Sequence, residues 1–235
     1  MSKVTISQSV IKTLANFCEI NKSIHIKPGN TISTISVNNN ILAKAEVDVE
    51  FPVELPIYDL GMFISALKLF TAQDKLPVLL FDEKVSNKFT ITQDGSRTKS
   101  VFHLADPSII HSPPDTNIKG LDSNVTFSLD ENEVARLRTA ASSYMLPDFC
   151  VYSTGGLVHA CVTDNKNSAS NSFSIEVGKS DDEFCYCCKF ENIKVLIQDY
   201  DITIANDRVL HFKSKNVKKY NPDNCEYWIA LEPVN

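Results

Sequence analysis

The chain repeats one order of secondary-structure patterns in its two halves, and this repeat limits the fold more than any other feature. In the first half, the strand-like segment 4–7 runs directly into a helical pattern with apolar positions Val10, Ile11, Leu14 and Phe17. In the second half, segment 125–128 runs into a helical pattern with Val134, Leu137 and Ala141. We expect helix caps at Ser7 or Ser9 and at Asp130, which has Glu133 three residues later.

A second helical pattern follows in each half, over residues 59–70 and 190–198. β-rich runs fill the rest of the chain, at 31–37, 41–47, 76–81, 88–93, 100–104, 149–154, 157–163, 172–177, 184–189, 201–204, 209–213 and 227–231. Because the same order occurs twice, duplication explains the pattern better than chance does. We predict an α+β fold of two similar domains, each with two helices packed on antiparallel sheets.

A proline-containing segment separates the two copies. Residues 106–124 contain Pro107, Pro113 and Pro114 and show no sustained periodicity, which is typical of an extended connector. We therefore predict a first domain at 1–108, a connector at 109–124 and a second domain at 125–235.

The cysteines and the absence of long apolar runs indicate where the protein works. No run approaches the roughly 18–20 apolar residues of a membrane span, and no signal peptide is apparent, so we expect no membrane partner. Seven cysteines, an odd number, favour reduced thiols in a cytoplasm over a disulfide framework. The cluster Cys185, Cys187 and Cys188 lacks the C-x-x-C spacing of a zinc site. We expect Cys185 and Cys187 to share one strand face and to bind no metal.

Sequence motifs of catalysis are missing. Gly178-Lys179-Ser180 is similar to the end of a phosphate-binding loop, but Phe173 occupies the position of the first glycine that the loop requires. The five histidines are scattered, and seven glycines include no dinucleotide fingerprint. We predict that the chain is not an enzyme and needs no cofactor.

Positive charge is segregated on the helices although the net charge is −6. That net charge argues against tight DNA binding, since proteins that neutralise phosphates are usually basic. The acids of the predicted helices lie mostly in first turns, where the helix dipole favours them. The polar faces carry the candidate DNA-facing residues Lys12, Lys68, Arg136, Arg138 and Lys194. Taken alone, such cations are more often ordinary solvated side chains than DNA contacts.

Four stretches in register carry a resemblance to a known family. They are Asn16-Phe17 with Ile20-Asn21, Ile24, Lys27 and Gly29; Ile57-Tyr58-Asp59-Leu60 with Phe63; Ala105-Asp106-Pro107-Ser108; and Tyr227 with Ala230-Leu231-Glu232. Together with the duplicated architecture, these stretches resemble the sliding clamps, or DNA polymerase processivity factors, of T-even-type bacteriophages. The resemblance is weakest over residues 149–189, where cysteine is abundant.

The resemblance implies a specific assembly and set of partners. It implies a head-to-tail homotrimer whose helices line a hole around duplex DNA, in the cytoplasm of an infected bacterium. The implied partners are the phage DNA polymerase, an ATP-dependent clamp loader and a late-transcription apparatus. A partner peptide is expected near the connector, where the candidates are Ile109, Ile110 and Trp228. The alternatives are a phage structural or assembly protein with duplicated β-rich domains and, third, a small-molecule enzyme.

Overall fold

The computed structural model describes residues 2–71, 75–82, 87–114, 123–205, 208–215 and 224–233. The chain divides into two compact units, the first from residues 1–115 and 217–225 and the second from residues 116–216 and 226–235. The predicted connector 109–124 covers this change of unit. Its residues 115–122 lie outside the described residues, so the connector and the domain limits stay predictions.

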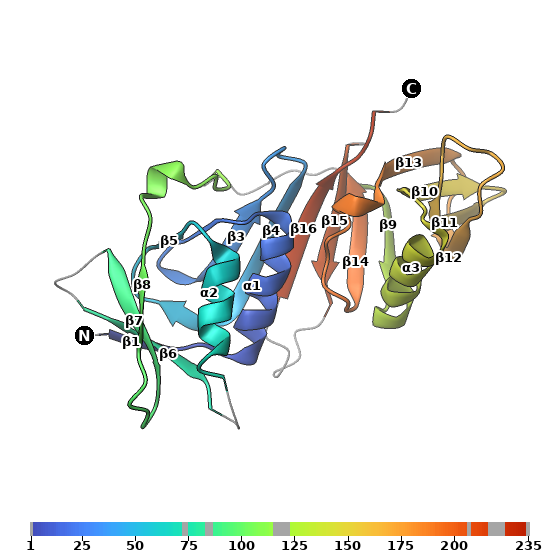
Figure 1. The fold of residues 1–235 in the computed structure, drawn as a ribbon. Coiled ribbons are helices and arrows are strands. Elements are labelled where there is room, and N and C mark those ends of the chain that lie inside the picture. The colour runs from blue at the N-terminus through green and yellow to red at the C-terminus, as the bar shows by residue number, and fades with distance from the viewer. Residues whose placement is uncertain are drawn as a thin grey trace. The chain divides into compact units, whose positions relative to one another are not determined.

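In the described part of the first unit, two α-helices pack against antiparallel strands (Figure 1). One sheet has the order β1-β6-β7-β8, and β2 pairs with β5 while β3 pairs with β4. The elements are β1 (Ser2–Thr5), α1 (Gln8–Ile20), β2 (Ile24–Ile26), β3 (Gly29–Ile35), β4 (Ile41–Phe51), β5 (Leu55–Ile57), α2 (Leu60–Lys68), β6 (Pro77–Phe81), β7 (Lys88–Gln93), β8 (Ser100–His103) and the 3-10 turn η1 (Pro107–Ile109).

Caps and apolar stripes explain where the first two helices begin and what they bury. The Ser7 hydroxyl accepts a hydrogen bond from the Val10 amide, and the Asp59 carboxylate accepts one from the Met62 amide at 2.7 Å. The apolar positions of α1 face the core, as the helical spacing predicts. Phe63 of α2 packs edge-on against Phe102 of β8, with ring centroids 5.3 Å apart, which fixes α2 beside that strand.

The described residues of the second unit form one α-helix and two antiparallel sheets. One sheet has the order β12-β11-β10-β13, with α3 packed on β11 and β12, and β14 lies between β9 and β15, which pairs with β16. The elements are β9 (Ser123–Leu129), α3 (Glu131–Tyr144), β10 (Asp148–Thr154), β11 (Leu157–Thr163), β12 (Phe173–Lys179), β13 (Phe184–Lys189), the 3-10 turn η2 (Phe190–Asn192), β14 (Tyr200–Ala205), β15 (Val209–Ser214) and β16 (Asn224–Ala230).

The predicted start of α3 is confirmed. Asp130 accepts from the Glu133 amide and the Glu133 carboxylate accepts from the Asp130 amide, which together form a capping box. The helix ends where Met145 adopts a left-handed conformation with φ of 55°.

The prediction of a fourth helix over residues 190–198 is wrong. Only the single turn η2 forms there, because side chains from elsewhere bind the backbone groups that a helix would use. Tyr200 donates to the Leu196 carbonyl at 2.9 Å, and the Leu196 amide donates to the Tyr227 hydroxyl. No side chain caps the start of the segment at Lys189, and Ile193, Val195 and Ile197 are β-branched residues of low helix propensity. The described residues therefore form three α-helices.

The expectation that all cysteines are reduced is also wrong for one pair. Cys150 of β10 and Cys187 of β13 are directly opposite each other and form a disulfide. The odd number of cysteines could not reveal this pair, because the two residues are 37 positions apart and only the strand register brings them together. The prediction that Cys185 and Cys187 share a face is confirmed by their Sγ–Sγ distance of 3.8 Å.

None of the helices in the described ranges has the length and apolar character that a membrane crossing requires.

Candidate nucleic-acid interface

The exposed face of α3 carries one free-standing positive charge among small polar residues. Arg136 is exposed; Asn132 lies four residues before it, and Thr139 and Ser143 follow it at helical spacing. The Arg136 guanidinium lies 5.3 Å from the centre of the Phe173 ring at the start of β12. A cation over an aromatic face is weakly held at an exposed site, so Arg136 keeps its charge available to a ligand.

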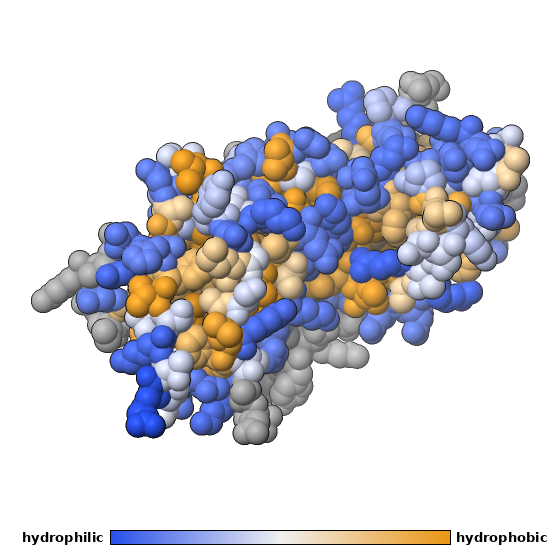
Figure 2. Space-filling model, in the orientation of Figure 1, coloured by the Kyte–Doolittle hydropathy of each residue, from blue (hydrophilic) through white to orange (hydrophobic). Residues whose placement is uncertain are grey.

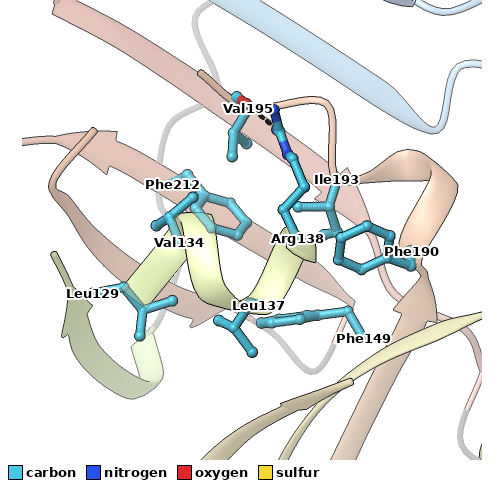
Figure 3. A pocket seen from close by; sticks show the side chains of 9 residues that line it. All are labelled: Leu129, Val134, Leu137, Arg138, Phe149, Phe190, Ile193, Val195 and Phe212. Atoms are coloured by element: carbon cyan, nitrogen blue, oxygen red, sulfur yellow. Dashed lines mark hydrogen bonds between the residues drawn. The ribbon is translucent and has the colours of Figure 1, made fainter. Parts of the chain in front are cut away.

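Arg138 extends from α3 toward Val195 and supports the fold (Figure 3). Its guanidinium donates a hydrogen bond to the Val195 carbonyl, and its stem lies beside Phe190 and Ile193. Arg138, one of the predicted DNA-facing residues, therefore also contributes to the fold. It extends from α3 over an apolar cavity that is lined by Leu129, Val134, Leu137, Phe149, Phe190, Ile193, Val195 and Phe212.

The two helices of the first unit each present one predicted cation to solvent. Lys12 is exposed on α1, but Glu19 is also exposed and lies only about 20° from it around the helix. Lys68 is exposed in the last turn of α2, where the helix dipole favours a positive charge. The net positive character of α1 is therefore smaller than the position of Lys12 alone suggests.

Lys194 does not lie on a helix. It is half-buried in the segment that follows η2, next to Val195, whose carbonyl binds Arg138. The structure thus brings Arg138 and Lys194 close together in the second unit, whereas Lys12 and Lys68 belong to the first unit. Lys12, Lys68 and Arg136 are the exposed members of the predicted set.

Lys22 is an exposed cation that the sequence reasoning passed over. It follows the end of α1, and its Nζ donates to the Cys18 carbonyl at 2.9 Å. A lysine just beyond a helix end commonly binds the last free carbonyls, and that position was the signal that could have identified it.

The acids of α2 and α3 are held at the helix starts. Asp59 and Asp130 are N-caps, and Glu131 and Glu133 occupy the first turn of α3. Their carboxylates therefore lie at the ends of α2 and α3, away from the exposed stripe of α3 that carries Arg136. The predicted charge segregation is confirmed for these two helices.

The candidates for partner binding differ in accessibility. Ile109 is 59% exposed at the end of η1, whereas Ile110 is buried. The Asp106 carboxylate caps this turn by accepting from the Ser108 amide, and that hydrogen bond lowers the pKa of Asp106. Trp228 is half-buried in the second unit and stacks on His211 with ring centroids 4.8 Å apart. Ile109 is the candidate that presents an apolar side chain directly to solvent.

The segment 178–180 has no phosphate-loop geometry. Gly178 and Lys179 end strand β12, and Ser180 leads into a turn in place of the helix that a phosphate loop requires. This agrees with the missing glycine at Phe173.

Comparison with known proteins connects this architecture to DNA replication. The family model of the DNA polymerase processivity factor matches residues 7–111. The sliding clamp of Vibrio phage KVP40 is 31% identical over 235 residues, covering 97% of this chain and 99% of that protein. The sliding clamp of Escherichia phage RB69 is 36% identical over 237 residues, covering 97% and 96%.

A solved structure has the same fold at much lower identity. The PCNA of A. fulgidus, determined with the C-terminal region of FEN-1 bound, superposes with a TM-score of 0.73 at 14% identity over the whole of both chains. This similarity supports the two-domain arrangement of helices on antiparallel sheets. Because the two phage proteins match nearly the full chain, the protein belongs to the DNA polymerase processivity factor family of phage sliding clamps and is not an enzyme.

Proposed function

We propose that three copies of the chain join head to tail into a closed ring around duplex DNA and tether the phage DNA polymerase for processive synthesis. The ring would hold any sequence, because phosphate contacts carry no sequence information. The proposal rests on two surfaces, one on each unit. Each of them combines an open sheet edge with exposed apolar side chains.

The first unit has an open sheet edge beside exposed apolar side chains. Strand β8 is last in the order β1-β6-β7-β8, and Phe63 of α2 packs against Phe102 of β8. On α2, Met62 is 61% exposed and Leu69, which follows its last turn, is 77% exposed. The face of this unit that carries α1 and α2 shows hydrophobic side chains at the surface (Figure 2). An open edge and an apolar patch together favour association with another chain.

The second unit has the corresponding features. Strand β12 is last in the order β12-β11-β10-β13, and its Ile175 and Val177 are half-exposed. Beside it lies a hollow on the exposed side of α3 that is lined by Asn132, Ala135, Arg136, Thr139, Ala140, Ser143, Tyr144 and Phe173. Antiparallel addition of β8 from one copy to β12 of the next would satisfy both edges and bring α2 to the Tyr144 end of this hollow, which leaves Arg136 free to face the DNA.

This contact joins different surfaces, so it repeats from copy to copy and closes into a ring if the rotation allows. Three chains supply six similar domains, which is the arrangement that the phage clamp resemblance implies. The occupant of both surfaces is thus a second copy of the same chain.

Sedimentation equilibrium at micromolar concentration tests the assembly. Wild type should have three times the 26.2 kDa mass of one chain. Leu69→Asp should dissociate into monomers, because it puts a charge into the apolar contact. Val37→Asp is the matched control, since Val37 is 73% exposed in the turn between β3 and β4. A monomeric wild type, or a trimeric Leu69→Asp variant, would refute the proposed contact.

The DNA-facing role is assigned to Lys12, Lys68 and Arg136, with Arg138 and Lys194 as weaker members because both are partly buried. Such a sparse set would screen phosphates without holding them tightly, which permits sliding, and the net charge of −6 would discourage binding elsewhere. Loaded protein should remain on a closed circular duplex and be lost when the circle is cut. Retention on the linear form would contradict encirclement.

The remaining partners follow from the family. We propose that an ATP-dependent loader opens the ring, because the chain has no nucleotide-binding motif of its own, and that the protein acts in the cytoplasm of the infected bacterium. We include the late-transcription apparatus on the resemblance alone. We propose that the polymerase peptide binds at the exposed Ile109, which the buried Ile110 supports. Trp228 is a second candidate for this contact.

A further inference from the structure

Three cysteines of the second unit gather at one place on the sheet β12-β11-β10-β13. The Sγ atoms of Cys150, Cys185 and Cys187 all lie within 4.8 Å of one another. Cys150 and Cys187 are cross-strand partners on β10 and β13, and Cys185 is two residues before Cys187 on the same strand face. The backbones of all three residues are fixed by β-ladder pairing, so the sulfur positions are preorganised.

We propose that these three cysteines, when the Cys150–Cys187 disulfide is reduced, bind one thiophilic divalent cation such as Zn²⁺. A dithiol reductant would supply the two electrons and two protons that convert the disulfide into two thiols, and would itself become a disulfide. Binding of the cation would then release the three S–H protons, because the thiolate is the ligand. The site would keep one open coordination position for water.

The spacing of the sulfur atoms fits such an ion. Zinc–thiolate bonds are about 2.3 Å, which makes the edge of a tetrahedron about 3.8 Å. The Sγ atoms of Cys185 and Cys187 are 3.8 Å apart without being bonded. Once reduced, Cys150 and Cys187 must move apart from bonding distance, and the same separation would give the second edge. The third edge joins Cys150 and Cys185, whose Sγ atoms lie within 4.8 Å of each other.

The surroundings of the three cysteines leave one sulfur accessible from solvent and two buried. Cys185 is exposed, whereas Cys150 and Cys187 are buried. An ion would therefore meet Cys185 first and reach two thiols that water does not solvate well. Soft thiolate ligands select zinc and related metals over the hard cations magnesium and calcium.

Cys161 lies near the three cysteines but is not a ligand of the proposed site. It lies opposite Cys150 on the other side of β10 and is buried, but its Sγ contacts the Val162 carbonyl and is not within the group of three. Three protein ligands, and not four, are therefore available from the described residues.

Metal titration of the reduced protein tests the proposal. Cd²⁺ is added to protein that has been treated with a phosphine reductant, and the cadmium–thiolate charge-transfer band and the native mass are recorded. One ion per chain is expected, with a rise in Tm because binding to the folded state stabilises it. Protein left in the disulfide form should bind no ion.

Two variants separate the metal site from its alternatives. Cys185→Ser should weaken binding by at least about tenfold, since even loss of an outer-shell partner commonly costs that much. It keeps the Cys150–Cys187 pair, and its exposed position leaves folding intact. Cys18→Ala is the control, because Cys18 lies in α1 of the first unit. Equal binding by wild type and Cys185→Ser, or no binding by reduced wild type, would show that the cluster is a disulfide and packing feature only.

Discussion

The Arg138 guanidinium on α3 donates a hydrogen bond to the backbone carbonyl of Val195, 57 residues further along the chain. This bond holds the segment that follows η2 against α3, at the place where the sequence pattern predicted a helix. An arginine that the sequence indicates as a candidate DNA contact therefore has a structural role.

Arg138→Ala should lower the free energy of unfolding by about 2 kcal/mol. It removes a hydrogen bond from a charged donor and the packing of the arginine stem on Phe190 and Ile193. Arg136→Ala should cost less than about 1 kcal/mol, because Arg136 is exposed and its contact is with one aromatic ring. Urea unfolding of both variants at one protein concentration measures the difference. Equal losses would show that the bond to Val195 contributes nothing.

Lys189→Met should destabilise the second unit by about 2 kcal/mol. Lys189 donates to the carboxylate of Asp148, whose side chain is buried, and breaking a buried pair commonly costs about 3–5 kcal/mol. We expect less because Lys189 is about one-third exposed and because Asp148 also accepts from the Asn165 amide. Lys166→Met, at an exposed turn position, should change stability by less than about 0.5 kcal/mol.

The same pair gives stability a pH dependence. The hydrogen bond to Asp148 raises the pKa of Lys189 above its ordinary value of 10.5. The contribution is therefore fully present below about 10.5, which is the unfolded-state pKa, and is lost as the pH rises through the folded-state pKa. Thermal melts across this alkaline range should show a steeper loss for wild type than for Lys189→Met, and parallel curves would contradict the pairing.

Lys12→Glu combined with Lys68→Glu should reduce loading and polymerase processivity with little change in thermal stability. Both side chains are exposed, so the substitutions affect phosphate attraction and not the core. The defect should deepen as salt rises, because salt screens the attraction that remains. Primer extension on a primed circular template with loader and polymerase measures the effect. The control, Lys166→Glu with Lys75→Glu, makes the same charge change at exposed positions outside the helices and outside the proposed subunit contact. An equal defect in the control would show that Lys12 and Lys68 do not line the hole.

Cys188 should resist alkylation in the folded, reduced protein while Cys185 reacts. Burial raises the pKa of Cys188 to about 12, so its thiolate is scarce near neutral pH, and the side chain is inaccessible. Burial also raises the pKa of Cys185, but that residue is exposed. Peptide mass spectrometry after timed iodoacetamide treatment gives the order. Labelling of Cys188 as fast as Cys185 would mean that β13 opens readily.

Local patterns predicted most of the fold because local physics determines it. Three strand predictions match the observed bounds, at Lys88–Gln93, Leu157–Thr163 and Phe184–Lys189. The caps at Ser7 and Asp130 also form as the sequence indicates. Strands β2 and β5 were missed because each has only three residues, too few to show a period.

The sequence-based predictions were wrong where residues far apart in the sequence determine the local structure. Residues 190–198 have helical spacing of apolar residues, but Arg138, Tyr200 and Tyr227 bind their backbone. The Cys150–Cys187 pair depends on the register between β10 and β13, which no local signal contains. For the candidate site, the sequence identified the cations, but it could not reveal that Arg138 binds the Val195 carbonyl while Arg136 is exposed to solvent.

The different sheet edges of the two units make the two halves of the chain non-interchangeable in the proposed ring. An artificial chain of two first halves would present β8 edges with no β12 edge to receive them, and a chain of two second halves would have the reverse defect. The two different edges thus give each chain a direction in the proposed ring. A permuted gene that places residues 125–235 before residues 1–108 should still assemble, whereas a gene that repeats either half should not.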